Sequence, residues 1–172
     1  MTEILCRVHR DVLHVIFPKS KGNTWSECHI NFLNDQKKPE LVYSNPDRCR
    51  DILRVSARYE GENEFVGFNL PSSYIRKEDV TLYPYKKKYP LLKYVIAYMD
   101  GDTDTIAHEK RHAKYHIDHA YRKKVKRSWN KLRRSHPKKH MSILNDLKKK
   151  GYDKKVFIDE FQAYYPDLVN SI

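Results

Sequence analysis

The feature that most constrains this chain is His108-Glu109-x-x-His112, which lies within residues 104–116, a segment typical of a helix. Residues four apart on a helix share a face, with Cβ atoms about 5–6 Å apart, so the two histidines can bind one metal ion. Glu109 then stands beside that ion, where it can accept a proton from water rather than act as a ligand. The five residues alone are equally consistent with a solvated helix that carries two ordinary histidines.

Both flanks favour a helix in this place. Residues 100–104 contain a glycine, a threonine and three aspartates, which suit a turn with N-capping side chains at the positive end of a helix dipole. Residues 91–99 are rich in aromatic and β-branched side chains, which predicts a strand. The predicted order is therefore strand, acidic turn and metal-binding helix.

A reactive zinc ion needs a third protein ligand and one open position. Glu160 lies in a later helical pattern with the apolar residues Phe157, Ile158, Phe161 and Tyr164. An unpaired carboxylate is costly to bury among such residues, and a metal would relieve that cost. Glu160 is therefore the favoured third ligand.

Two other residues are alternative third ligands. Asp118 follows His108 by ten residues, and a continuous helix would carry it about 15 Å along the axis. This spacing resembles the metzincin branch of the zinc peptidases, in which a glycine breaks the helix so that the chain can turn back toward the metal, but here Tyr115 stands at the glycine position. His116 lies two helical turns from His108, so both residues suit the site less well than Glu160.

At this point the chain resembles a known family. His108-Glu109-x-x-His112 followed by Asp159-Glu160-x-x-Ala163 is similar to the gluzincin branch of the zincin metallopeptidases, and the similarity covers the C-terminal third of the chain. The resemblance implies Zn²⁺ bound by His108, His112 and Glu160. It also implies that Glu109 is the general base in the hydrolysis of a peptide or protein substrate.

The resemblance departs from the family pattern at one position. Many gluzincins have an acid four residues after the ligand glutamate, where it orients a zinc-binding histidine, and here that residue is Tyr164. Asp159 is a candidate to replace that acid. The hydrogen-bond donor that would stabilise an oxyanion is left open among Tyr164, His116 and His119.

The sequence predicts an α+β fold in a single zincin-like domain, with a mostly antiparallel sheet in residues 1–100 and a helical part in residues 101–172. Strands are expected at residues 11–17, 27–33, 41–43, 64–70, 80–85 and 91–99. Residues 46–59 fit both helical and strand spacing, and a helix is favoured. We expect an edge strand, 80–85 or 94–99, to pair with extended substrate.

Further helices are expected after the metal-binding helix. Apolar spacing predicts three helices. The first covers residues 122–134, the second ends at Gly151, and the last covers residues 153–165 and stops at Pro166. Three helices would then follow the motif, or two if 122–134 continues the metal-binding helix.

Positive charge is concentrated in one region of the chain. The net charge is +12, and residues 110–155 hold 18 Lys and Arg residues against three acids. These side chains either form solvated helix faces or attract nucleic acid or an acidic protein. A catalytically inactive zincin-like basic module with such a partner is therefore the alternative to an enzyme.

The composition also indicates where in the cell the protein is expected. No apolar run approaches the length of a membrane helix, and no signal-peptide pattern begins the sequence, so we expect no membrane partner. The three cysteines, at positions 6, 28 and 49, are widely spaced, which favours reduced thiols over disulfides. An intracellular protein, cytoplasmic or nuclear, is expected.

Overall fold

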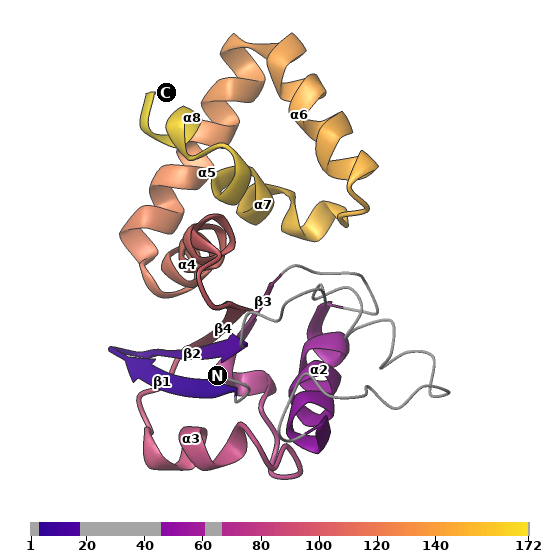
Figure 1. Cartoon of the computed structure of the whole chain (residues 1–172). Coiled ribbons are helices and arrows are strands. Elements are labelled where there is room, and N and C mark those ends of the chain that lie inside the picture. The colour runs from indigo at the N-terminus through magenta and orange to yellow at the C-terminus, as the bar shows by residue number, and fades with distance from the viewer. Residues whose placement is uncertain (1–3, 18–45, 61–66, 172) are drawn as a thin grey trace. The chain divides into compact units, whose positions relative to one another are not determined.

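The computed structural model describes residues 4–17, 46–60 and 67–171 (Figure 1). These residues form two compact units, Met1–Glu109 and Lys110–Ile172, and the boundary between them falls inside one continuous helix, α4 (Thr103–Ile117). A sheet and several helices make up the first unit, whereas the described part of the second is helical. The predicted α+β class is confirmed. The single domain over residues 1–172 stays a prediction.

The first unit contains a four-stranded mixed sheet. Its strands are β1 (Leu5–His9), β2 (Val12–Phe17), β3 (Phe68–Pro71) and β4 (Tyr94–Met99), in the spatial order β1-β2-β4-β3. The pairs β1·β2 and β3·β4 are antiparallel, whereas β2·β4 is parallel. The mostly antiparallel sheet is therefore confirmed, with one parallel pair at its centre.

Burial follows the position of each strand in the sheet. In β2 the side chains alternate between half-buried and fully buried, as expected for a strand with one face toward the core. In β4 five consecutive residues are buried, as expected for a central strand covered on both faces. Ile52, Leu53 and Val55 of helix α2 (Pro46–Glu60) belong to the same hydrophobic core.

The helix favoured for residues 46–59 is confirmed as α2, and the strands expected at 11–17 and 91–99 are confirmed as β2 and β4. The strand expected at residues 64–70 corresponds to β3 where it is described. The strands expected at 27–33 and 41–43 lie outside the described residues.

The strand expected at residues 80–85 is wrong. After the 3-10 turn Ser72–Tyr74, the chain forms helix α3 (Tyr83–Lys88), which has Pro84 in its first turn. Proline lacks the N–H that a strand ladder needs but fits the start of a helix, so it overrides the β-branched and aromatic residues before it. Val80, the first residue of the expected strand, is 71% exposed.

Neither of the two segments that were expected to form an edge strand does so. Residues 80–85 form no strand, and β4 is internal because it pairs with both β2 and β3. Within the described sheet the outer strands are β1 and β3.

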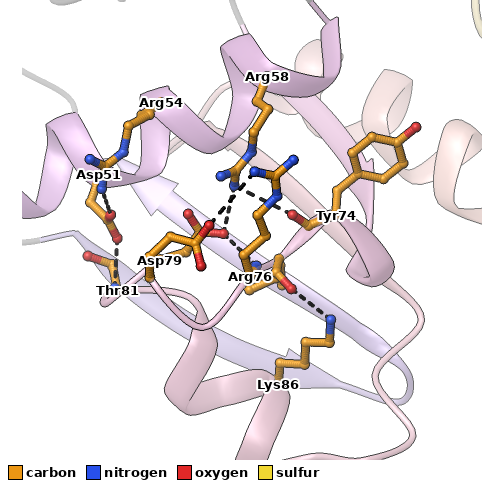
Figure 2. A network of polar contacts seen from close by, with 10 residues as sticks. Asp51, Arg54, Arg58, Tyr74, Arg76, Asp79, Thr81 and Lys86 are labelled. Atoms are coloured by element: carbon orange, nitrogen blue, oxygen red, sulfur yellow. Dashed lines mark hydrogen bonds and ion pairs between the residues drawn. The ribbon is translucent and has the colours of Figure 1, made fainter.

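Two buried aspartates tie α2 to the segment before α3 (Figure 2). Asp79 is fully buried and accepts hydrogen bonds from Arg58 Nη2 at 2.7 Å and from the backbone N–H of Arg76 at 2.6 Å. Asp51 accepts from Arg54 Nη2 at 2.6 Å and from the backbone N–H of Thr81 at 2.7 Å. Each carboxylate therefore compensates its burial with one guanidinium and one backbone donor.

The helices of the second unit pack around a hydrophobic core of aliphatic and aromatic residues. After α4 come α5 (His119–Ser135), α6 (Pro137–Lys149), the 3-10 turn Lys154–Val156, α7 (Phe157–Tyr164) and α8 (Pro166–Ser171). The core consists of Val125, Trp129, Leu132, Ile143, Leu147, Phe157, Phe161 and Val169. Trp129 contacts the rings of Phe161 and His140 at centroid distances of 5.0 and 4.5 Å.

The helix boundaries resolve what spacing left open. Asp118 separates α4 from α5, because its carboxylate caps α5 by accepting from the backbone N–H of Tyr121 at 2.9 Å. Gly151, at φ +87°, follows the end of α6 as expected. Pro166 was expected only to stop a helix, but it also begins α8. No described helix combines the length and apolar character needed to cross a membrane.

Candidate metal centre

Helix α4 carries the His-Glu-x-x-His sequence, as predicted. Its first turn is fixed by Asp102, whose carboxylate accepts from the backbone N–H of Thr105 at 3.0 Å and from the Thr105 hydroxyl at 2.7 Å. This is the N-cap that the acidic turn predicts. His108 and His112 are one helical turn apart on α4; His108 is half-buried and His112 is 2% exposed.

His108, His112 and Glu160 form a group that could hold a metal ion. Each offers one ligand atom, and these three atoms lie within 4.8 Å of one another. Glu160 comes from helix α7 and is 8% exposed. Two imidazoles and one carboxylate are a ligand set found in catalytic zinc sites, where tetrahedral coordination would place donor atoms ~3.3 Å apart. The chemistry of the donor set is therefore compatible with zinc.

His112 is oriented by the residue beside Glu160. Its Nδ1 lies 2.9 Å from Asp159 Oδ1, whereas its Nε2 faces Glu160 Oε2 at 3.8 Å. Asp159 Oδ1 also accepts from Gln162 Nε2 at 3.0 Å. A carboxylate on one ring nitrogen fixes the ring and directs the other nitrogen toward a metal. Asp159 thus makes the contact with a histidine that was expected of it, in place of the acid that many gluzincins have at the position of Tyr164.

Helix α7 is held on both sides of Glu160. Phe157 and Phe161 anchor it in the core of the helical unit. At its last turn, Arg111 Nη1 donates to the carbonyl of Ala163 at 2.9 Å. Tyr121 OH donates to Gln162 Oε1 at 3.1 Å. These contacts fix Glu160 and Asp159 on a rigid element, as a preorganised ligand requires.

Glu109 is buried within the first unit and held by the sheet. It is 5% exposed, and its Oε2 accepts a hydrogen bond from Asn69 Nδ2 of β3 at 2.9 Å. Tyr94 OH of β4 donates in turn to Asn69 Oδ1. These two hydrogen bonds therefore link strands β3 and β4 to the carboxylate of Glu109, the residue that the motif predicts to be a general base.

Gly67 allows α4 to lie close to this part of the sheet. A Cβ atom at this position would lie 2.5 Å from Thr105 Cγ2, 2.8 Å from the carbonyl oxygen of Ala97 and 3.0 Å from Glu109 Oε1. Real Cβ atoms do not approach backbone oxygens so closely, so a larger residue here would displace Glu109 or the helix.

The other candidates stay outside the ligand group. Asp118 uses its carboxylate to cap α5. His116 lies beyond His112 on α4, where burial and the charge of Arg122 lower its pKa. Tyr164 is 39% exposed and its hydroxyl lies 2.9 Å from that of Tyr152. His119 is exposed at the start of α5.

The sequence does not indicate that Asn69, Tyr94 and Gly67 lie around Glu109. Each sits in or beside a strand, and no local pattern distinguishes it from an ordinary residue of a sheet or turn. A comparison with protein-family models, with curated proteins and with solved structures found no match to this chain. A proposal about function therefore rests on the geometry of the site and on the motifs of the sequence.

Proposed function

We propose that this protein is a zinc-dependent metallopeptidase that hydrolyses peptide bonds. The observation that carries the proposal is the group of ligand atoms from His108, His112 and Glu160, all within 4.8 Å of one another. It is supported by the bond between His112 and Asp159, which a histidine on a solvated helix face would not need. The similarity of the two motifs to gluzincins points to the same chemistry.

Each residue has a distinct role in this proposal. His108, His112 and Glu160 bind the ion, and Asp159 orients His112. When bound, zinc would make water acidic enough to react at neutral pH and would polarise the scissile carbonyl. Glu109 accepts a proton at its carboxylate and passes it to the leaving amine.

The hydrogen bond from Asn69 gives Glu109 a fixed orientation for this work. A general base must be held within hydrogen-bond reach of the proton that it accepts, and a buried carboxylate tied to a strand loses little rotational freedom on reaction. Asn69 lies on β3, an outer strand of the described sheet. An extended peptide that paired along β3 would place its backbone beside this carboxylate.

The test compares the wild-type chain with Glu109→Gln on a fluorogenic peptide library. Glutamine has the same shape but cannot accept the proton, so cleavage should fall by about 10²–10⁴-fold while zinc content and melting temperature stay unchanged. Equal cleavage by both proteins would eliminate the proposed mechanism. Zinc binding without cleavage by the wild type would instead favour the inactive zincin-like module that binds nucleic acid or an acidic protein.

A further inference from the structure

A row of basic side chains lies on one face of helix α5. Lys123, Arg127, Lys131 and Arg134 are all exposed, and they follow one another at intervals of four, four and three residues. Residues at these intervals lie on the same side of a helix. We call these four residues the α5 basic row.

The opposite face of α5 is packed into the helical unit. Val125, Trp129 and Leu132 are buried in its core, and Ser128 Oγ donates to the carbonyl of Val169 at 3.2 Å. The buried residues fix the rotation of α5 about its axis. The α5 basic row therefore faces away from the core of its own unit.

The charge on this helix is not balanced locally. Residues 1–109 contain 16 basic and 16 acidic residues, whereas residues 110–172 contain 18 and 6, so the net +12 of the chain comes from the second unit. Helix α5 itself carries eight Lys and Arg residues and no acid. Such segregation attracts polyanions and raises their rate of association.

Two members of the row are available for an anionic partner. Among the described residues, Lys123 and Arg127 form no ion pair, and Arg134 Nε donates at 3.3 Å to the carbonyl of Asn130 in its own helix. By contrast, Lys150 pairs with Asp146 on α6 at 2.6 Å. Lys123 and Arg127 thus carry positive charge that no ion pair in the described part of the chain neutralises.

We propose that the α5 basic row binds the phosphate backbone of nucleic acid without sequence preference. From Lys123 to Arg134 the row spans about 16 Å of helix axis. That length faces about five phosphates of one strand, at about 3.4 Å per phosphate along the axis. Phosphate contacts of this kind position a protein on nucleic acid but read no sequence.

The row fits nucleic acid better than a folded acidic protein. Protein interfaces depend on a few buried aromatic, aliphatic or arginine anchors within a shielded patch. The exposed large hydrophobic residues of the described chain are Tyr74, Val80, Leu91, Met141 and Tyr164, and none is on α5. A charged face without an apolar anchor suits a uniform polyanion, and the proposal does not depend on the peptidase assignment.

The experiment measures binding of the full-length chain to a fluorescent 20-base-pair duplex DNA between about 50 and 200 mM salt. The test variant replaces Lys123, Arg127, Lys131 and Arg134 with glutamine. A matched control makes the same change at four exposed basic residues of the first unit, Arg76, Lys77, Lys87 and Lys88. Both variants lower the net charge equally.

In the test variant, the slope of log affinity against log salt should become shallower by about 3 to 4, because each lost phosphate contact contributes about 0.9. The control variant should keep the wild-type slope. A variant that exchanges Lys for Arg and Arg for Lys at the four row positions should also keep it, which separates loss of charge from damage to packing.

Three results would overturn the proposal. They are an unchanged slope in the test variant, an equal change in the control variant, or competition by polyglutamate as effective as competition by unlabelled DNA. The last result would point to an acidic protein partner. Circular dichroism and zinc content should match the wild type in every variant, because the row lies on neither the packed face nor the metal-binding helix.

Discussion

The hydrogen bond from Asn69 to Glu109 tests the proposed chemistry at the scale of a single residue. Asn69→Leu keeps the side-chain volume but removes the donor at Glu109 Oε2. A hydrogen bond to a charged group contributes about 1.5–3 kcal/mol, so kcat should fall about tenfold to hundredfold with little change in KM. Steady-state kinetics on a cleaved library peptide would measure both parameters.

Tyr94→Phe is the matched variant for this prediction. It removes the hydroxyl that donates to Asn69 but leaves the Asn69–Glu109 contact in place, so its effect on kcat should be smaller. Zinc content should be unchanged in both variants. Unchanged kcat in Asn69→Leu would contradict a positioning role, whereas loss of zinc would show that Asn69 serves the fold instead.

At this scale the sequence points to the residues of the candidate metal group more readily than to the residues that hold them in place. His108 and His112 could be found because helical spacing places them together, and Glu160 because a carboxylate stands out in an apolar stripe. Asp159 could be predicted as well, because it adjoins Glu160. The role of Asn69 could not be predicted, because it arises only when β3 pairs with β4 and brings Asn69 to Glu109, 40 residues away along the chain.

At the scale of elements, we expect the buried carboxylates of Asp51 and Asp79 to hold α2 in place (Figure 2). Asp79→Asn should destabilise the first unit by about 3 kcal/mol, because it leaves the guanidinium of Arg58 without a compensating charge in a largely buried place. Urea denaturation followed by circular dichroism would measure the change in the free energy of unfolding.

Glu78→Gln is the control for Asp79→Asn. Glu78 is exposed, and its carboxylate lies 3.8 Å from the exposed guanidinium of Arg76. Surface ion pairs of this kind contribute little, so the free energy of unfolding should change by less than about 0.5 kcal/mol. Equal effects of the two substitutions would contradict the distinction between a buried structural carboxylate and a solvated one.

Helices were predicted from sequence more accurately than strands, for a physical reason. The spacing of Val125, Trp129 and Leu132 predicts α5 because a helix satisfies its backbone hydrogen bonds locally. A strand is defined by its neighbours, so the pattern at residues 80–85 could not exclude helix α3. The same limit applies to which strand lies at an edge, since that depends on sheet order rather than on local sequence.

At the scale of the whole molecule, the net positive charge is confined to the second unit, whereas the candidate functional residues are not. The first unit has equal numbers of basic and acidic residues, whereas the second carries the whole net charge. Within the first unit Asn69 holds Glu109, and within the second Asp159 holds His112. Composition alone predicted the basic region, because charge requires no knowledge of contacts. Its orientation required the structure, since only burial of the opposite face shows where the α5 basic row points.

The most direct test of the proposed metal centre is the zinc content of the purified full-length chain, measured by elemental analysis. Wild type and Asp118→Asn should each hold about one zinc ion per chain, because asparagine can still cap α5 and Asp118 is not a ligand. Glu160→Gln should lose most of its zinc while keeping its helical circular dichroism spectrum. A wild-type chain that binds no zinc after incubation with the metal, or Glu160→Gln that retains it fully, would contradict the proposed centre.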